Sequence, residues 1–214
     1  MIIIIPAYNP PNKFYDLIIE IYNLYNLPII IVDDGSYTKI KKSKYYTLLV
    51  NNINMGKGYS LKKAFNYAIK RSYTHAITLD CDFQHDPLSI SDFIDSNINY
   101  DIVLGKREFN NSMPLSRRFS NYLSSLILSL ITKTKIFDSQ CGFRRYNLDA
   151  LSLINTVENG FQFESEILIK LLNNGGTLGH VHIKTNYNNE KSNINKFSDS
   201  KKFIMMIIKY IYEN

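Results

Sequence analysis

The sequence predicts an α/β fold with a mainly parallel sheet flanked by helices. Short apolar runs alternate along the chain with segments of helical periodicity, which is the pattern of parallel β–α units. The first two runs, residues 2–5 and 28–32, are almost continuously apolar, as in strands buried on both faces. Polar clusters follow three of the runs directly, where such sheets bind ligands.

Each element is predicted from its local pattern. The opening apolar run is cut at Pro6, so we interpret it as a buried strand. Apolar residues recur at helical spacing in the helical segments, as in Leu123, Leu126, Ile127 and Leu130 on one face of a later helix. The predicted order is strand 2–5, helix 13–25, strands 28–32 and 47–50, a helix entered through residues 56–58, strands 76–79 and 102–104, helices 116–132 and 163–172, strand 178–184 and helix 199–212.

Length, charge and cysteine content narrow the class of protein. The 214 residues are enough for one domain with its own core. The formal net charge is +6, which suits phosphate-bearing substrates or an anionic membrane, and the dispersed basic residues disfavour nucleic acid. Cys81 and Cys141 form no zinc motif or disulfide framework, and the N-terminus lacks the features of a signal peptide. No stretch reaches the roughly 18 apolar residues of a membrane span, so we expect a cytoplasmic protein.

The cluster after residues 76–79 predicts a metal site. In extended chain, Asp80 and Asp82 point the same way, and their carboxylates repel unless a cation lies between them. Gln84 adds a neutral oxygen two residues on, and such oxygen ligands suit Mg²⁺ or Mn²⁺. The alternative is a solvated acidic turn, with Asp86 and Pro87 capping the next helix.

Two further clusters allow a binding or a structural interpretation. Asp33 and Asp34 end the second strand, where they can accept hydrogen bonds from a base or ribose and can also form an Asp-Gly turn with Gly35, since the two interpretations are compatible. Gly56-Lys57-Gly58 opens a helix, where Lys57 supplies positive charge for a phosphate. The alternative is an ordinary helix-starting turn.

Taken together, these motifs resemble glycosyltransferase family 2, particularly the polyprenyl-phosphate and dolichol-phosphate mannose and glucose synthases. The resemblance covers nearly the whole chain, and the segment from Leu79 to Pro87 matches best. It implies the GT-A fold, with a Rossmann-like sheet, as one domain over residues 1–214 with a nucleotide-binding half (about 1–105) and an acceptor-binding half (about 106–214). The implied nucleotide-sugar contacts are Pro6, Ala7, Tyr8, Asn9, Asp33, Asp34, Lys57, Asp80, Cys81 and Asp82, and the implied ligands of Mg²⁺ or Mn²⁺ are Asp80, Asp82 and Gln84. Pro10 stands where the family commonly has an acidic residue, which puts one nucleotide contact in question.

The resemblance also implies an inverting single displacement, with Asp80, Asp82 and Arg118 as the catalytic residues. A hexose would pass from GDP-mannose or UDP-glucose to a polyprenyl or dolichyl phosphate, which needs positive residues rather than a strong base. The candidates for holding that phosphate are Arg107, Arg117, Arg118 and Arg144. Alternatively, some of these arginines pair with Glu108 or Asp138 on the surface.

Two alternative functions remain open at this stage. Transfer to a hydroxyl of a polysaccharide, glycan or glycolipid would require a carboxylate base, and Asp138, Glu164 and Glu166 are the later acids available. A chain without catalytic activity would serve as a nucleotide-binding scaffold. The apolar side of helix 199–212 either packs in the core or rests on a membrane, and a lipid acceptor would place the protein at the cytoplasmic membrane face.

Overall fold

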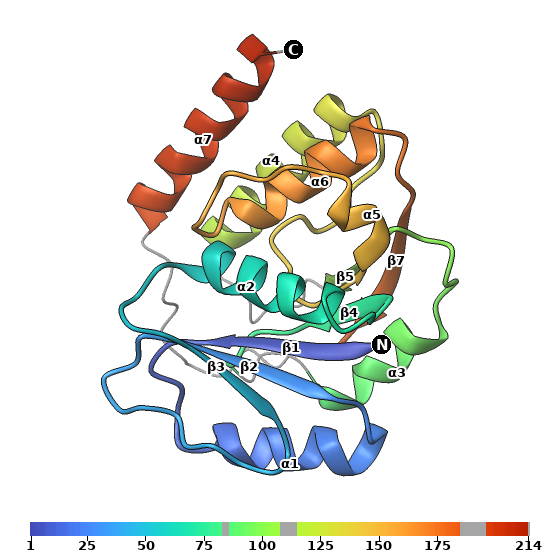
Figure 1. The fold of residues 1–214 in the computed structure, drawn as a ribbon. Coiled ribbons are helices and arrows are strands. Elements are labelled where there is room, and N and C mark those ends of the chain that lie inside the picture. Colours follow the sequence, from blue (N-terminus) through green and yellow to red (C-terminus); the bar gives the residue numbers. More distant parts are fainter. Residues whose placement is uncertain (83–85, 108–114, 185–195, 214) are drawn as a thin grey trace.

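The computed structural model describes residues 1–82, 86–107, 115–184 and 196–213, with the backbone alone at 115–117, 196–197 and 213. A seven-stranded sheet runs through its centre, and helices cover both faces (Figure 1). The elements are β1 (Ile2–Ala7), α1 (Phe14–Tyr25), β2 (Ile29–Asp34), β3 (Thr47–Asn51), α2 (Lys57–Ile69), β4 (His75–Thr78), the 3₁₀ turn η1 (Pro87–Ser89), α3 (Ile90–Asp95), β5 (Ile102–Arg107), α4 (Leu115–Thr132), β6 (Arg144–Asn147), α5 (Leu148–Ser152), α6 (Phe163–Asn173), β7 (Leu178–Ile183) and α7 (Lys196–Glu213).

The predicted mainly parallel sheet is confirmed. Its strand order is β3-β2-β1-β4-β6-β5-β7, and β1, β2, β3 and β4 pair in parallel, as do β5 and β7. Strand β6 runs antiparallel to both of its neighbours, β4 and β5. The sequence analysis did not predict β6, because the Arg144-Arg145 pair that opens it does not have the apolar pattern of a buried strand.

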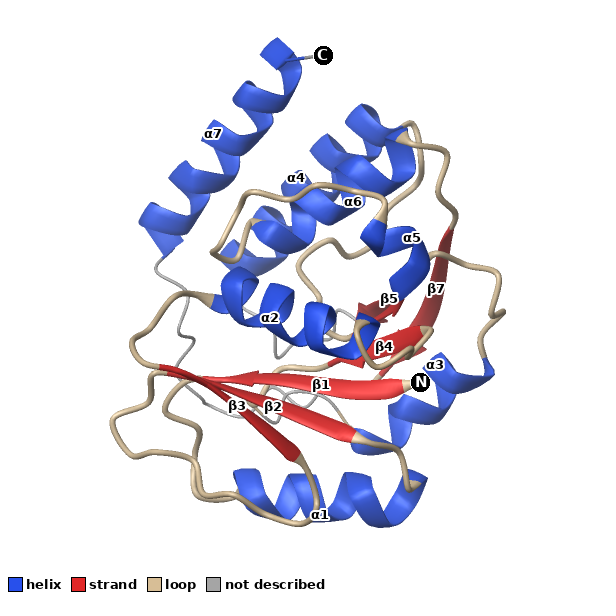
Figure 2. Cartoon of the chain, viewed as in Figure 1, coloured by secondary structure: helices blue, strands red, loops and turns tan. Residues whose placement is uncertain are grey.

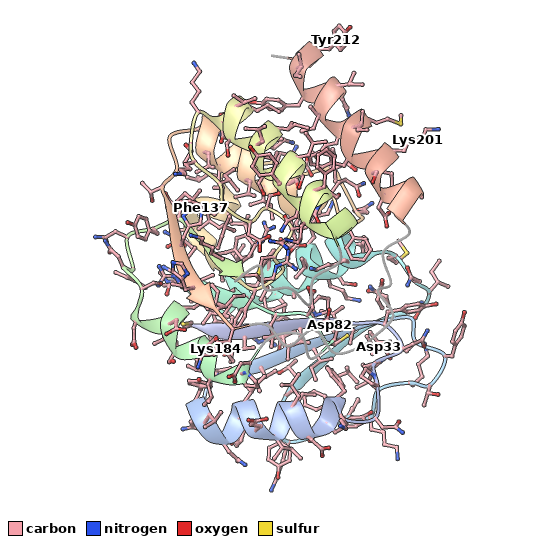
Figure 3. The ribbon with its side chains drawn as sticks, turned by 180° about the vertical axis from the view of Figure 1, so that it is seen from behind. Asp33, Asp82, Phe137, Lys184, Lys201 and Tyr212 are labelled. Atoms are coloured by element: carbon pink, nitrogen blue, oxygen red, sulfur yellow. The ribbon has the colours of Figure 1, made fainter. Side chains whose placement is uncertain are left out.

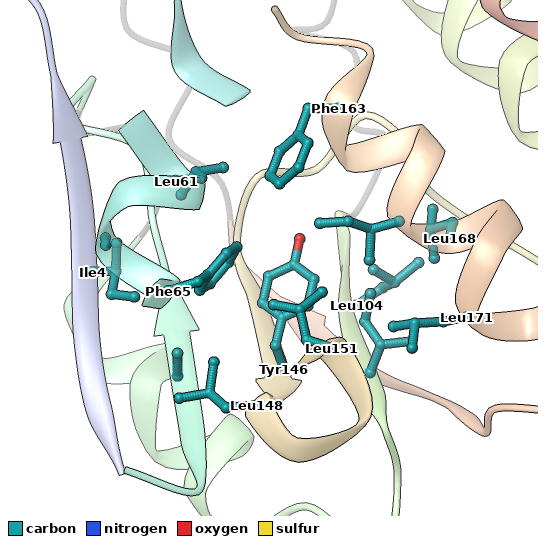
Figure 4. Packing of buried hydrophobic residues seen from close by; sticks show 14 of the residues in the cluster. Ile4, Leu61, Phe65, Leu104, Tyr146, Leu148, Leu151, Phe163, Leu168 and Leu171 are labelled. Carbon is teal, nitrogen blue, oxygen red and sulfur yellow. The ribbon is translucent and has the colours of Figure 1, made fainter. Parts of the chain in front are cut away.

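Each face of the sheet has its own hydrophobic core. Along β1, Ile2 and Ile4 point to one face and Ile3 and Ile5 to the other, as the period of two requires. Helices α1 and α3 cover one face, and α2, α4, α5 and α6 gather over the other (Figure 2). On this second face, the Phe65 ring meets those of Tyr146 and Phe163, with centroids 5.1 and 6.5 Å apart (Figure 4).

Helix α4 has an unexpected polarity. Its apolar face was predicted from Leu123, Leu126, Ile127 and Leu130, yet Leu130 is 71% exposed and Leu123 and Leu126 are each more than 40% exposed. The side that faces the protein carries mainly small polar residues, namely Asn121, Ser124, Ser125 and Thr132, together with Leu128. Ile127, the fourth residue of the predicted face, is partly buried and packs against the core, as does Ile131. The helix therefore turns its small polar residues toward the protein and several of its large apolar residues toward solvent.

Helix α7 is predicted correctly as an element, and its apolar residues are divided between two environments. Met206 and Ile207 are buried in the core, whereas Ile204 and Ile211 are more than half exposed. Within the described part of the chain, neither α7 nor any other helix combines the length and hydrophobicity needed to cross a bilayer.

Candidate active site

The three polar clusters predicted from the sequence meet at one edge of the sheet. Strands β2, β1 and β4 are adjacent and parallel, so their carboxyl ends lie side by side. In the register of the sheet, Ala7 at the end of β1 pairs with Asp33, and Asp80 follows β4 by two residues. In the view of Figure 3, Asp33 and Asp82 lie at the same end of the sheet. A single crevice can therefore receive side chains from all three loops.

The first two loops are tied to each other. The Asn9 amide donates to Ser36 Oγ at 2.9 Å, and the Tyr37 amide donates to Asn9 Oδ1 at 2.9 Å. Asn9 has a positive φ of 48°, a conformation that asparagine tolerates better than most residues. Pro6 and Ala7 lie in the buried end of β1, and Tyr8 is half-buried. The loop of Pro6, Ala7, Tyr8 and Asn9 is thus fixed against the loop after β2.

Asp33 and Asp34 shape the loops around the crevice. Both side chains are buried. Asp33 accepts hydrogen bonds from the amides of Ser36 and Ile40. These bonds form the turn at Gly35 that the Asp-Gly pair predicts. Asp34 accepts from Asn51 Nδ2 at 2.8 Å and from the amides of Met55 and Gly56, both at 2.9 Å. Asp34 thereby holds the loop from which Lys57 begins α2.

Lys57 lies between two carboxylates. Its Nζ is 2.7 Å from Asp80 Oδ1 and 2.8 Å from Glu164 Oε2. Burial opposes the charge of the ammonium, but the two carboxylates outweigh burial and raise its pKa above the ordinary value. The side chain of Asp80 is 30% exposed and that of Glu164 only 8%. Lys57 is therefore a fixed positive charge at this edge of the sheet, between the nearly buried Glu164 and the more exposed Asp80.

Gly142 allows this ion pair to form. A Cβ added there would lie 2.7 Å from Lys57 Nζ and 2.9 Å from Asp80 Cγ, closer than ordinary contact. The Gly142 carbonyl accepts a hydrogen bond from Thr78 Oγ1 at 3.0 Å, which fixes the segment beside the end of β4. The sequence analysis assigned no role to Gly142.

The loop after β4 offers oxygen ligands for a divalent cation. Burial, together with the charges of the flanking Asp80 and Asp82, raises the pKa of the Cys81 thiol to about 12. The Lys57 ammonium already places one positive charge against Asp80. Within the described residues, no cluster of three or more His, Cys, Asp or Glu side chains is placed to hold a metal. The two carboxylates fit a Mg²⁺ or Mn²⁺ ion shared with substrate phosphates rather than a closed protein site. Gln84, the third predicted ligand, lies outside the described residues.

Two of the four arginines predicted to hold an acceptor phosphate are buried and bound to protein groups. Arg107 pairs with Asp138, with Nε 2.7 Å from Oδ2 and Nη2 2.9 Å from Oδ1. Arg144 is fully buried and donates to the carbonyls of Cys141, Glu164 and Ser139. We therefore assign neither guanidinium group to an acceptor phosphate. The pairing of Arg107 with Asp138 was predicted for the surface, and the structure places it in the interior.

The other two arginines begin α4. Arg118 is partly exposed, and the side chain of Arg117 lies outside the described part of the structure. Arg118 is thus the member of the predicted set that the structure leaves accessible.

The three acids considered as a general base are all engaged. Asp138 is fully buried, and although burial alone would raise its pKa, the Arg107 guanidinium outweighs burial and lowers it. Glu164 binds Lys57. Glu166 accepts from the amides of Val157 and Glu158 and pairs with Lys170 at 2.8 Å.

Comparison with known proteins identifies the family. The family model described as "Glycosyl transferase family 2" matches residues 2–154, which is more than half of the chain. The chain belongs to glycosyltransferase family 2. As a family 2 member it is an enzyme of the glycosyltransferase class, as the motifs predicted. A relative from Methanococcus voltae, a UDP-N-acetylglucosamine–dolichyl-phosphate N-acetylglucosaminyltransferase, is 33% identical over 214 residues, covering 86% of this chain and 85% of the relative.

Another relative and a solved structure agree with this result. The polyprenol monophosphomannose synthase of Mycolicibacterium smegmatis is 20% identical over 217 residues, covering 93% of this chain and 81% of the relative. Glucosyl-3-phosphoglycerate synthase from Mycobacterium tuberculosis, crystallised with Mg²⁺ and UDP, superposes with a TM-score of 0.76 at 13% identity, covering 97% of this chain and 78% of that one. At this identity the likeness shows the fold, and the predicted GT-A fold is confirmed.

Proposed function

We propose that this family 2 enzyme transfers a hexose from a nucleoside-diphosphate sugar to a polyprenyl phosphate, with inversion at the anomeric carbon. Two relatives support the acceptor class, because their names describe transfer to dolichyl phosphate or synthesis of a polyprenol phosphosugar. The enzyme would then work where its lipid acceptor lies, at a membrane face.

The observation that carries the choice of acceptor is the engagement of the three described acids that were candidates for a general base. A hydroxyl acceptor must lose a proton, and the carboxylate that removes it must reach the acceptor oxygen. Asp138, Glu164 and Glu166 are all buried, and each is bonded to a cationic side chain. A phosphate monoester is already an anion at neutral pH and requires none of them. Their engagement therefore favours a phosphate over a hydroxyl.

The donor diphosphate would bind at the crevice edge. Asp80 and Asp82 would hold a Mg²⁺ or Mn²⁺ ion that neutralises the diphosphate as it leaves. Lys57 begins α2, so its ammonium and the amino end of that helix place positive charge together. Glu164, 2.8 Å from Lys57 Nζ, would keep Lys57 in place while Asp80 holds the metal. The loops fixed by Asp33 and Asp34 would receive the nucleoside, beside Tyr8 and Asn9.

The reaction itself is one displacement. An oxygen of the acceptor phosphate forms a bond to the anomeric carbon while the bond from that carbon to the diphosphate oxygen breaks. The nucleoside diphosphate takes the electron pair. Arg118 is our candidate for holding the acceptor phosphate during attack, because a guanidinium fork matches phosphate oxygens.

A labelled-donor screen tests this function. Full-length enzyme with Mn²⁺ would be given GDP-mannose, UDP-glucose or UDP-N-acetylglucosamine, with polyprenyl phosphate or the matching polyprenol as acceptor. We expect label in the lipid phosphate with one donor and none in polyprenol. Transfer to polyprenol but to no lipid phosphate would refute the proposed acceptor.

Arg118→Met adds a residue-level check. We expect it to raise KM for polyprenyl phosphate about tenfold while leaving donor KM unchanged. An equal effect on both substrates would remove Arg118 from the acceptor site.

A further inference from the structure

Helix α4 exposes a continuous apolar stripe to solvent. Phe119 and Tyr122 are each about two-thirds exposed, at 68% and 65%, and Leu123, Leu126 and Leu130 continue the same side of the helix. Their spacing of three and four residues puts them in one row. Large exposed apolar rows of this kind mark a surface that is covered in the working state of a protein.

The inward side of α4 shows that this polarity is built into the packing. Ser124 Oγ lies 3.0 Å from Ser139 Oγ, and Ser125 Oγ accepts from the Ser139 amide at 2.9 Å. Asn121 donates to Asp138 Oδ1 at 2.9 Å. Rotating the helix to bury the leucines would break all of these bonds in the interior. The apolar stripe therefore faces outward because the polar side is needed inside.

The charge pattern of α4 indicates what covers the stripe. Residues 119–132 contain no Asp, Glu, Lys or Arg, whereas Arg118 stands at one end and Lys133 and Lys135 stand at the other. If two copies paired through α4, cations would meet cations whether the helices ran parallel or antiparallel. An anionic bilayer instead takes the stripe among its acyl chains and the cations among its headgroups.

We propose that the outer face of α4, from Phe119 to Leu130, is the surface by which this enzyme rests on an anionic membrane. The inference rests on the proposed function in one respect, because a polyprenyl acceptor gives the enzyme a reason to meet a bilayer. The α4 surface is connected to the active site by only a few residues. Ser139 is bonded to α4, and Gly142, three residues later, lies against the Lys57–Asp80 pair. A bilayer on α4 thus lies beside the part of the chain that lines the crevice.

Vesicle co-sedimentation of the full chain tests the surface. Wild-type protein would be mixed with vesicles of phosphatidylcholine alone or with added phosphatidylglycerol. We expect binding to the anionic vesicles, reduced by high salt. The test variant is Leu126→Glu with Leu130→Glu, and its matched control is Leu88→Glu with Leu153→Glu, two exposed leucines outside α4. Both variants add the same charge, so the net repulsion from the vesicle is equal.

We expect the α4 variant to bind about 30-fold more weakly than the control, since it loses two leucines from the apolar contact. Equal binding by the two variants, or no binding by wild type, would overturn the inference. A wild-type dimer in solution that the α4 variant converts to a monomer would also overturn it, in favour of a second copy as the occupant.

A short-chain, water-soluble isoprenyl phosphate separates this inference from the proposed function. We expect the α4 variant to transfer sugar to it at the wild-type rate, because the crevice is unchanged. Vesicle binding without transfer to any lipid phosphate would contradict the proposed function alone. Transfer without α4-dependent vesicle binding would contradict the membrane surface alone.

Discussion

Gly142→Ala is a perturbation whose effect follows directly from the geometry of the site. The added methyl would lie 2.7 Å from Lys57 Nζ, and opening that contact to the 3.4 Å of ordinary packing moves the ammonium by about 0.7 Å. Asp80 must move further than Lys57, since its Oδ2 is the atom nearest the added methyl and its Cγ would be 2.9 Å away. All of these atoms belong to side-chain ends, so the backbone of the sheet is not forced to change.

The expected cost falls on catalysis more than on folding. A misplacement of about 1 Å in a positioning group lowers rates by roughly 100-fold, so we expect kcat/KM to fall by about 10- to 100-fold. Weakening one charge-assisted contact costs about 1–2 kcal/mol, which corresponds to a decrease in Tm of only a few degrees.

Steady-state transfer kinetics and a thermal melt on the same preparation measure both effects. Gly175→Ala is the matched control, because its φ of 82° strains an alanine while the new methyl meets nothing within 4 Å. We expect that control to lower Tm with kcat/KM unchanged. Wild-type kcat/KM in Gly142→Ala would refute the proposal that Lys57 and Asp80 both act at the donor diphosphate.

Three further changes test other parts of the site. Asp82→Asn should lower kcat by about 10²–10³-fold with an unchanged melt, and retained turnover would exclude Asp82 from metal binding. Glu164→Gln should raise donor KM and cost about 2 kcal/mol in chemical denaturation, because Lys57 loses its inner carboxylate; an unaltered donor KM would remove Glu164 from the site. Burial, with a smaller contribution from Lys106, lowers the pKa of His180 to about 4 from 6.5. As the pH falls, the His180 imidazole is therefore protonated in the unfolded chain before it is protonated in the folded one. Stability should therefore fall as pH drops from 6.5 to 4, and His180→Gln should flatten this part of a Tm–pH curve; an unchanged curve would show that His180 is not the cause.

Much of the fold was predictable because the strands of this sheet carry strong local signals. The isoleucine runs of β1 and β2 are apolar at every position that faces a core, and the helices between them are periodic. Strand β6 gave no such signal. Arg144 and Arg145 can be fully buried there because backbone carbonyls accept hydrogen bonds from their guanidinium groups. Those carbonyls belong to other parts of the fold.

The site was predictable as a set of loops and less so as a set of contacts. Asp33, Asp34 and Asp80 stand at strand ends, and parallel pairing brings those ends together. The pairing of Lys57 with Glu164 joins the two halves of the chain, and no local pattern in the sequence connects them. The polarity of α4 was misjudged for the same reason, since Ser124 and Ser125 face inward to meet Ser139 in a later loop.

The most direct measurement is a crystal structure with Mn²⁺ and the preferred nucleotide, with the metal located by its anomalous signal. We expect one manganese ion in contact with Asp80, Asp82 and the diphosphate. We also expect Lys57 to keep its ion pair with Glu164 and to lie beside the phosphates. Manganese bound elsewhere, or a nucleotide bound away from the edge formed by β1, β2 and β4, would contradict the central claim that this edge binds and activates the donor.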